Sequence, residues 1–228
     1  MSKVTLFITA CNRADLLKRT IESFLKYNTY PIEKCIITED SDQTNNNDFA
    51  IEMCPFPVEI IYNGKNMGHC YSIEKGYSKI TTEYIFHCEE DWEFFKPGFI
   101  EKSLEILEKD PSVITVQLRS HNNESGHMVE EEDRGGYHYM TTFFLGVWHG
   151  FTLNPGLRRL SDYTKFAPWT ESCKSYMWHG ILDETCLSIF YYYKGYRGAT
   201  TTDKEGFVKH IGWDRHVPRP QDAPGFFY

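Results

Sequence analysis

Residues 4–118 alternate between short apolar runs and helix-like segments, and this alternation restricts the fold more than any other feature of the chain. The runs are short and rich in β-branched or aromatic residues, as buried strands are. They comprise Val4–Thr9, Lys34–Thr38, Val58–Tyr62, Tyr84–Cys88 and Val113–Leu118. Because helical patterns separate most of them, we expect an α/β fold with a mostly parallel central sheet flanked by helices.

The expected helices carry apolar residues at helical spacing. Asn12 is a candidate N-cap for the first of them, and Pro97 suits the first turn of another. The second half of the chain is less regular, although Asp183–Tyr193 also has a helical pattern. A length of 228 residues fits one domain, residues 1–228, with a ligand-binding half at about 1–118 and a second half at about 119–228.

Three consecutive carboxylates, Glu89, Glu90 and Asp91, follow the fourth apolar run. Adjacent like charges repel, so such a cluster needs either full solvation or a cation. The carboxyl end of a strand is where α/β sheets bind ligands. The pattern therefore predicts a divalent metal that holds a phosphate-bearing substrate. Neighbours on an extended backbone point in opposite directions, so at most one glutamate is expected to share a site with Asp91.

Two further polar loops follow strand ends, namely 11–13 and 39–42. In a parallel sheet they open on the same edge as the carboxylates. Asp40 could accept a hydrogen bond from the imide N–H of a uracil or from a guanine edge. An aspartate that merely forms a turn is the alternative interpretation.

Charge and cysteine content restrict the partners of the protein. A formal net charge of -8 argues against nucleic acid or an anionic membrane as the main partner. We find no apolar stretch long enough for a membrane span and no signal peptide pattern. The seven cysteines are scattered without zinc-ligand spacing, which favours reduced thiols in a cytoplasmic protein.

Five short motifs occur in a fixed order along residues 3–118. They are Thr9-Ala10-Cys11-Asn12-Arg13, Glu39-Asp40-Ser41-Asp42, Asn66-Met67-Gly68, Glu83-Tyr84-Ile85 before the carboxylates, and Pro97-Gly98-Phe99-Ile100. In this order the chain resembles nucleotide-sugar glycosyltransferases of the GT-A fold, closest to family 2. It departs from the family pattern in starting the metal motif with glutamate and in lacking a glycine after Asp40.

The resemblance implies roles for particular residues. Asp91 would bind Mn²⁺ or Mg²⁺, and His210 would be a late histidine ligand of the kind that several GT-A enzymes use. The nucleotide-sugar donor would be bound by Thr9, Ala10, Cys11, Arg13, Asp40, Asn66, Gly68, Glu89 and Glu90.

The family also carries an acidic pair at the start of a helix near the acceptor. Asp183 and Glu184 occupy that place here, and either could take a proton from an acceptor hydroxyl within hydrogen-bond reach. Acidic residues that only stabilise a helix N-terminus are the alternative. Trp148, Trp178 and His179 are candidates for the wall of the acceptor site.

The expected activity is a metal-dependent, inverting transfer of a sugar, with a UDP-sugar favoured as donor, to a hydroxyl of a glycan or other acceptor. A sugar-nucleotide pyrophosphorylase is a second possibility, but it would need a glycine-rich phosphate loop after the first strand, and residues 11–15 contain no glycine. A third is a degenerate GT-A protein that binds carbohydrate or a nucleotide without turnover.

Overall fold

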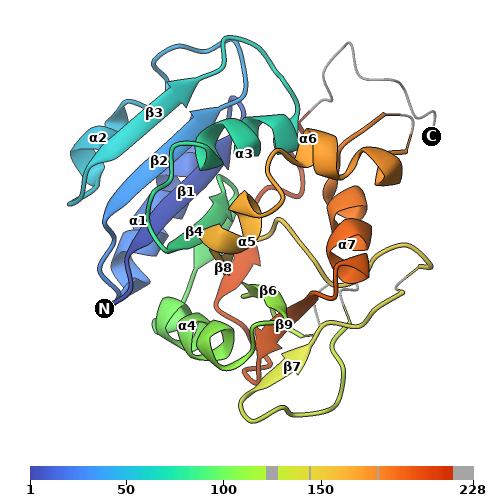
Figure 1. Cartoon of the computed structure of the whole chain (residues 1–228). Helices are drawn as coiled ribbons and strands as arrows, with labels where there is room; N and C mark the ends of the chain where they lie inside the picture. Colours follow the sequence, from blue (N-terminus) through green and yellow to red (C-terminus); the bar gives the residue numbers. More distant parts are fainter. Residues whose placement is uncertain (122–127, 144, 179, 218–228) are drawn as a thin grey trace.

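A computed structural model of the protein describes residues 1–121, 128–143, 145–178 and 180–217 (Figure 1). Within these residues an eight-stranded sheet has the order β3-β2-β1-β4-β8-β6-β9-β7, and β5 and β10 form a separate antiparallel pair. The expected α/β fold with a large, mostly parallel sheet between helices is confirmed.

The first half supplies the strands β1 (Val4–Ala10), β2 (Lys34–Glu39), β3 (Val58–Tyr62), β4 (Tyr84–Glu89), β5 (Trp92–Phe94) and β6 (Val113–Gln117). Its helices are α1 (Ala14–Tyr27), α2 (Phe49–Met53), α3 (His69–Tyr77) and α4 (Phe99–Lys109). The second half supplies β7 (Tyr137–Tyr139), β8 (Gly156–Arg159), β9 (Arg197–Thr201) and β10 (Val208–His210). Its helices are α5 (Leu160–Thr164), α6 (Trp169–Ser172), the 3₁₀ turn η1 (Lys174–Tyr176) and α7 (Glu184–Tyr193).

The sheet has an apolar cluster on each face, because successive side chains of a strand point to opposite sides. Leu6 and Ile8 of β1 belong to the cluster that α1 and α4 cover. Phe7, between them in sequence, belongs to the cluster that α3 and α7 cover. All seven residues of β1 are buried, as expected for a central strand covered on both faces.

Strand register brings the polar loops to one level at the carboxyl edge. Thr9 of β1 lies opposite Thr38 of β2 on one side and opposite Glu89 of β4 on the other. The loops that follow these three parallel strands therefore open side by side, as the sequence predicts.

Strand β8 was not predicted from the sequence. It runs antiparallel between β4 and β6 and thereby makes one continuous sheet from the two halves of the chain. It has only four residues, and two of them are Arg158 and Arg159, so it has no apolar run to mark it.

The prediction that Asn12 caps α1 is wrong. Asn12 has a φ of 53°, α1 begins at Ala14, and the residue before it, Arg13, makes no side-chain cap. Instead the backbone N–H of Asn12 donates to Glu39 Oε1 at 2.8 Å. This turn directs Arg13 into the site at the edge of the sheet.

Candidate active site

A pocket of about 270 Å³ opens at the carboxyl edge of the parallel strands. Every residue expected to bind the donor or the metal lines it, namely Thr9, Ala10, Cys11, Arg13, Asp40, Asn66, Gly68, Glu89, Glu90, Asp91 and His210. His69, Gly212, His216 and Val217 complete the lining, and the sequence analysis did not single them out. His69 directly follows the Asn66–Gly68 motif, and this position in the sequence could have identified it as a pocket residue.

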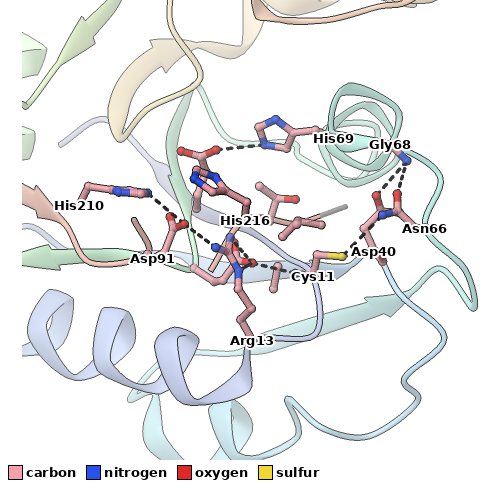
Figure 2. A pocket seen from close by; sticks show the side chains of 15 residues that line it. Cys11, Arg13, Asp40, Asn66, Gly68, His69, Asp91, His210 and His216 are labelled. Carbon is pink, nitrogen blue, oxygen red and sulfur yellow. Dashed lines mark hydrogen bonds and ion pairs between the residues drawn. The ribbon is translucent and has the colours of Figure 1, made fainter. Parts of the chain in front are cut away.

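Asp91 lies at the centre of the polar contacts, between Arg13 and His210 (Figure 2). Its Oδ2 atom is 2.9 Å from Arg13 Nη1 and 3.1 Å from His210 Nε2. Burial alone would raise the pKa of Asp91, but the hydrogen bond to His210 and the charge of Arg13 outweigh it and hold the pKa below its ordinary value. Asp91 is therefore held as a carboxylate, the form that binds a hard cation.

The pairing of β10 with β5 positions His210. In that pair His210 lies opposite Trp92, one residue beyond Asp91, and the two rings are 5.0 Å apart. Asp91 Oδ1 and His210 Nδ1 are buried and have no hydrogen-bond partner among the described residues. The unpartnered Oδ1 atom of Asp91 is available to a hard cation, and a carboxylate beside an imidazole is a ligand pair that suits a divalent ion such as Mn²⁺.

Within the described residues no group of three or more His, Cys, Asp or Glu side chains could hold a metal on its own. The pair of Asp91 and His210 leaves most of a coordination shell for other ligands. A donor diphosphate would supply oxygen atoms of the kind that such a shell takes.

Glu89 and Glu90 diverge, as neighbours on an extended backbone should. Glu90 is 3% exposed and accepts from the Cys11 N–H at 2.9 Å and from Arg13 Nε at 2.8 Å. Glu89 accepts from the indole N–H of Trp92 at 3.0 Å and lies 3.4 Å from His69 Nε2. Burial and the neighbouring charge of Asp91 raise the pKa of Glu89 well above its ordinary value.

Arg13 supplies the countercharge that the three carboxylates require. It pairs with Glu90 at 2.8 Å and with Asp91 at 2.9 Å, and it also donates to the Arg215 carbonyl. The sequence predicts that the carboxylates need either full solvation or a cation, and the guanidinium of Arg13 is one such cation. A metal would meet one carboxylate that is shared with Arg13.

Asp40 cross-links two loops. Its Oδ1 atom accepts from Asn63 Nδ2 and from the Met67 N–H, both at 2.8 Å, and its Oδ2 atom accepts from the Gly68 N–H at 3.0 Å. These bonds fix the Asn66–Gly68 loop at the pocket wall. Asp40 is thus more than a turn residue, and contact with a nucleobase stays a prediction.

Cys11 is a packing residue of the pocket floor. Its thiol donates to the Asp40 carbonyl at 3.0 Å, and burial raises its pKa to about 12. All seven cysteines are free thiols, as expected for reduced cysteines.

Asp183 and Glu184 lie outside this pocket and differ from each other in their contacts. Asp183 is exposed and caps α7 by accepting from the Cys186 N–H at 2.8 Å. Glu184 accepts at Oε2 from Thr152 Oγ1 at 2.9 Å and from the Leu153 N–H at 2.7 Å. Burial raises the pKa of Glu184, and these two bonds oppose that rise. Asp183 has the structural role that was the alternative interpretation, so Glu184 is the better candidate for a base.

Arg119, which follows β6, was not singled out from the sequence. It is 7% exposed, and its guanidinium lies 5.0 Å from the centre of the Trp92 ring. Burial lowers its pKa, and the charges of Glu89 and Glu184 act in the opposite direction, so Arg119 interacts with both carboxylates. Of the expected acceptor wall, Trp148 is buried, Trp178 is 66% exposed, and His179 lies outside the described residues.

The strand order and the acidic pocket at the carboxyl edge are those expected of the GT-A fold. A family model described as glycosyl transferase family 2 matches residues 5–162, more than half of the chain. The chain therefore belongs to glycosyl transferase family 2, as its motifs predict.

Two solved structures share the fold with TM-scores above 0.6, and a third matches less well. TarS from S. aureus matches with a TM-score of 0.64 and 10% identity, over 90% of this chain and 36% of that one. GalNAc-T7, solved with UDP, GalNAc and Mn²⁺, matches with a TM-score of 0.66 and 13% identity, over 96% of this chain and 45% of that one. The mannosyltransferase PcManGT from Pyrobaculum calidifontis, in complex with GDP-Man and Mn²⁺, matches with a TM-score of 0.46 and 16% identity. This match covers 52% of this chain and 36% of that one.

This chain spans less than half the length of those three structures. Comparison with curated protein sequences gives no significant match. Among the described residues, no helix has the length and apolar character that crossing a membrane requires.

Proposed function

We propose that the protein transfers a sugar from a nucleotide diphosphate sugar to a hydroxyl group of a glycan or other acceptor, with inversion at the anomeric carbon. The observation that carries the proposal is the pairing of Asp91 with His210 inside the pocket that the strand-end loops form. A UDP-sugar is the favoured donor, because Asp40 at the pocket wall could accept from the imide N–H of uracil.

The donor diphosphate would lie in the pocket that Arg13, Asp91 and His210 line. These two side chains would hold Mn²⁺ or Mg²⁺, which when bound supplies Lewis-acid stabilisation of the leaving diphosphate. Arg13 holds Asp91 as a carboxylate and adds positive charge beside the phosphates. The loop that Asp40 orders would form the wall against the nucleoside.

Glu184 would be the general base. Its Oε2 atom accepts from Thr152 and from Leu153, and these two bonds fix the orientation of the carboxylate that would take the proton of an acceptor hydroxyl. Removing that proton as the hydroxyl attacks from the face opposite the diphosphate gives inversion. A positioned base of this kind typically contributes about 10²–10⁴ in rate.

Calorimetry with nucleoside diphosphates, with and without Mn²⁺, followed by a donor-hydrolysis and transfer screen, tests this proposal. We expect Mn²⁺-dependent binding and turnover in the parent protein, and loss of both in Asp91→Asn. Asp42→Asn, a change to an exposed carboxylate, is the matched control and should behave like the parent. Full activity in Asp91→Asn would overturn the metal assignment. Binding without turnover of any donor would instead favour a degenerate, non-catalytic member of the family.

A further inference from the structure

A buried polar cluster is connected to Glu184, and none of its members lines the donor pocket. It contains Tyr77 of α3, His87 of β4 and Arg158 of β8, none of them more than 3% exposed. Thr152, which is fully buried, joins the cluster to Glu184. No step of the proposed reaction uses these groups, so their presence in an apolar core calls for a separate explanation.

Hydrogen bonds connect the cluster into a chain. Arg158 donates from Nη2 to the Thr152 carbonyl at 3.0 Å and from Nη1 to the Tyr77 hydroxyl at 3.1 Å. The Tyr77 hydroxyl lies 2.9 Å from His87 Nδ1. Burial and the charge of Arg158 hold the pKa of His87 well below its ordinary value, so His87 is neutral. Since the tyrosine oxygen accepts from Arg158, its own proton goes to His87 Nδ1.

Thr152 connects this chain to Glu184. Its carbonyl accepts from Arg158, while its hydroxyl donates to Glu184 Oε2 at 2.9 Å. The next N–H, that of Leu153, donates to the same oxygen at 2.7 Å. One turn along α7, Ser188 Oγ accepts from the His149 N–H at 2.8 Å, which fastens the same segment to the helix. The segment 149–153 is therefore clamped between α7 and Arg158.

The guanidinium of Arg158 lies 5.2 Å from the centre of the Phe151 ring, and its charge is not paired with a carboxylate among the described residues. Among the described residues no carboxylate lies within ion-pair distance of it, although its side chain is almost completely buried. Its Nε atom also lacks a hydrogen-bond partner there. A buried guanidinium costs free energy that an apolar side chain of the same length would not. The carboxylate on which it acts through Thr152 is Glu184.

We propose that Arg158 is a positioning residue for the base Glu184, on which it acts through Thr152. This rests on the proposed function. The charge of Arg158 lowers the pKa of Glu184 against the effect of burial. The other charged or titratable groups near Glu184 are Arg119 after β6, Glu89 of β4, Cys70 of α3 and Asp183 at the start of α7.

The test measures the pKa of Glu184 directly, by the pH dependence of its carboxyl carbon signal in protein labelled with ¹³C-glutamate. Glu184→Gln identifies the signal by removing it. We expect Arg158→Met to raise the pKa of Glu184 by about 1 and Arg158→Lys, which keeps the charge, to raise it less. The acidic limb of kcat/KM against pH should move to higher pH by the same amount in Arg158→Met.

Arg159→Met is the matched control, because Arg159 is the next residue of β8, points to the other face of the sheet and pairs with Asp162 at 2.8 Å. It should leave the pKa of Glu184 unchanged. Thermal melts establish that each variant is folded. An unchanged pKa of Glu184 in folded Arg158→Met would overturn the proposal. The pKa measurement needs no turnover, so a failure of the proposed function would show separately. Absence of transfer by the parent protein would overturn the transferase assignment, and full transfer activity in Glu184→Gln would overturn Glu184 as the base.

Discussion

The imidazole Nε2 atom of His210 lies 3.1 Å from Oδ2 of Asp91, although 119 positions separate the two residues in sequence. The antiparallel pairing of β10 with β5 produces this contact, because it sets His210 opposite Trp92. The two candidate metal ligands are thus in place before any metal or donor binds. A preformed pair loses little conformational freedom on binding, which favours affinity.

His210→Ala should lower the affinity for Mn²⁺ in the presence of UDP by about 10²-fold, because one of two protein ligands is lost. Calorimetric titration of Mn²⁺ measures this. His138→Ala, in β7 and outside the pocket lining, is the control. Equal Mn²⁺ affinity in the His210 variant and the parent would remove His210 from the ligand set.

Gly212→Ala should disturb Asp91 without removing any ligand. A Cβ atom at position 212 would lie 2.5 Å from Asp91 Oδ2 and 2.8 Å from Asp91 Cβ, closer than real contacts allow. The carboxylate must then move away from His210 and Arg13. We expect a loss of at least about 10-fold in Mn²⁺-dependent nucleotide affinity, equivalent to about 1.4 kcal/mol, with near-normal folding by circular dichroism. Unaltered affinity would mean that the carboxylate position is not critical.

Asp40→Asn should loosen the Asn66–Gly68 loop. The carboxylate satisfies three donors with two oxygens, and an amide has only one oxygen to accept them. Leaving a buried donor unsatisfied costs about 1–3 kcal/mol. Urea unfolding should report that loss, and calorimetry should report weaker nucleotide binding. If stability and binding both match those of Asp42→Asn, the cross-link is dispensable.

Glu184→Gln and Asp183→Asn separate the two candidate bases. Glutamine keeps the shape of Glu184 but cannot accept a proton, so transfer should fall by about 10²–10⁴ while donor binding persists. Asparagine at position 183 remains a good N-cap, so activity should be nearly unchanged. Transfer assays at saturating donor distinguish them. If Asp183→Asn loses more transfer activity than Glu184→Gln, the base is Asp183.

Asp110→Asn should weaken the fold in a pH-dependent way. Burial alone would raise the pKa of Asp110, but hydrogen bonds from Ser112, Tyr139 and Tyr137 outweigh it and lower the pKa to about 2. The folded-state pKa is below the unfolded value of about 3.9, so the stabilisation is present above pH 4 and is lost as pH falls towards 2. Allowing for solvent screening, it amounts to about 1–2 kcal/mol. Urea unfolding should show that the free energies of unfolding of the parent and of Asp110→Asn converge between pH 7 and pH 3. A constant difference between the two free energies over this range would contradict the prediction.

The parallel half of the fold was predictable because its strands are apolar runs and its main helices carry apolar residues at helical spacing. Predicted Val58–Tyr62 coincides with β3, and the other predicted strands differ from the observed ones by a residue at most. Strand β8 was not predictable, since Arg158 and Arg159 occupy a strand that is buried by its neighbours and not by its own composition. The capping prediction at Asn12 failed because a tertiary bond to Glu39 determines that turn.

Local patterns in the sequence determined which residues reach the edge of the sheet. An apolar strand that ends in carboxylates carries them to its carboxyl end, and the resemblance to the family pointed to eleven donor and metal residues, which all line one pocket. Only the tertiary structure decided how they are charged and paired. Arg13 neutralises Glu90 and Asp91, and His210 reaches Asp91 from the far end of the chain. Such contacts depend on strand pairing across long separations, for which local spacing carries no signal.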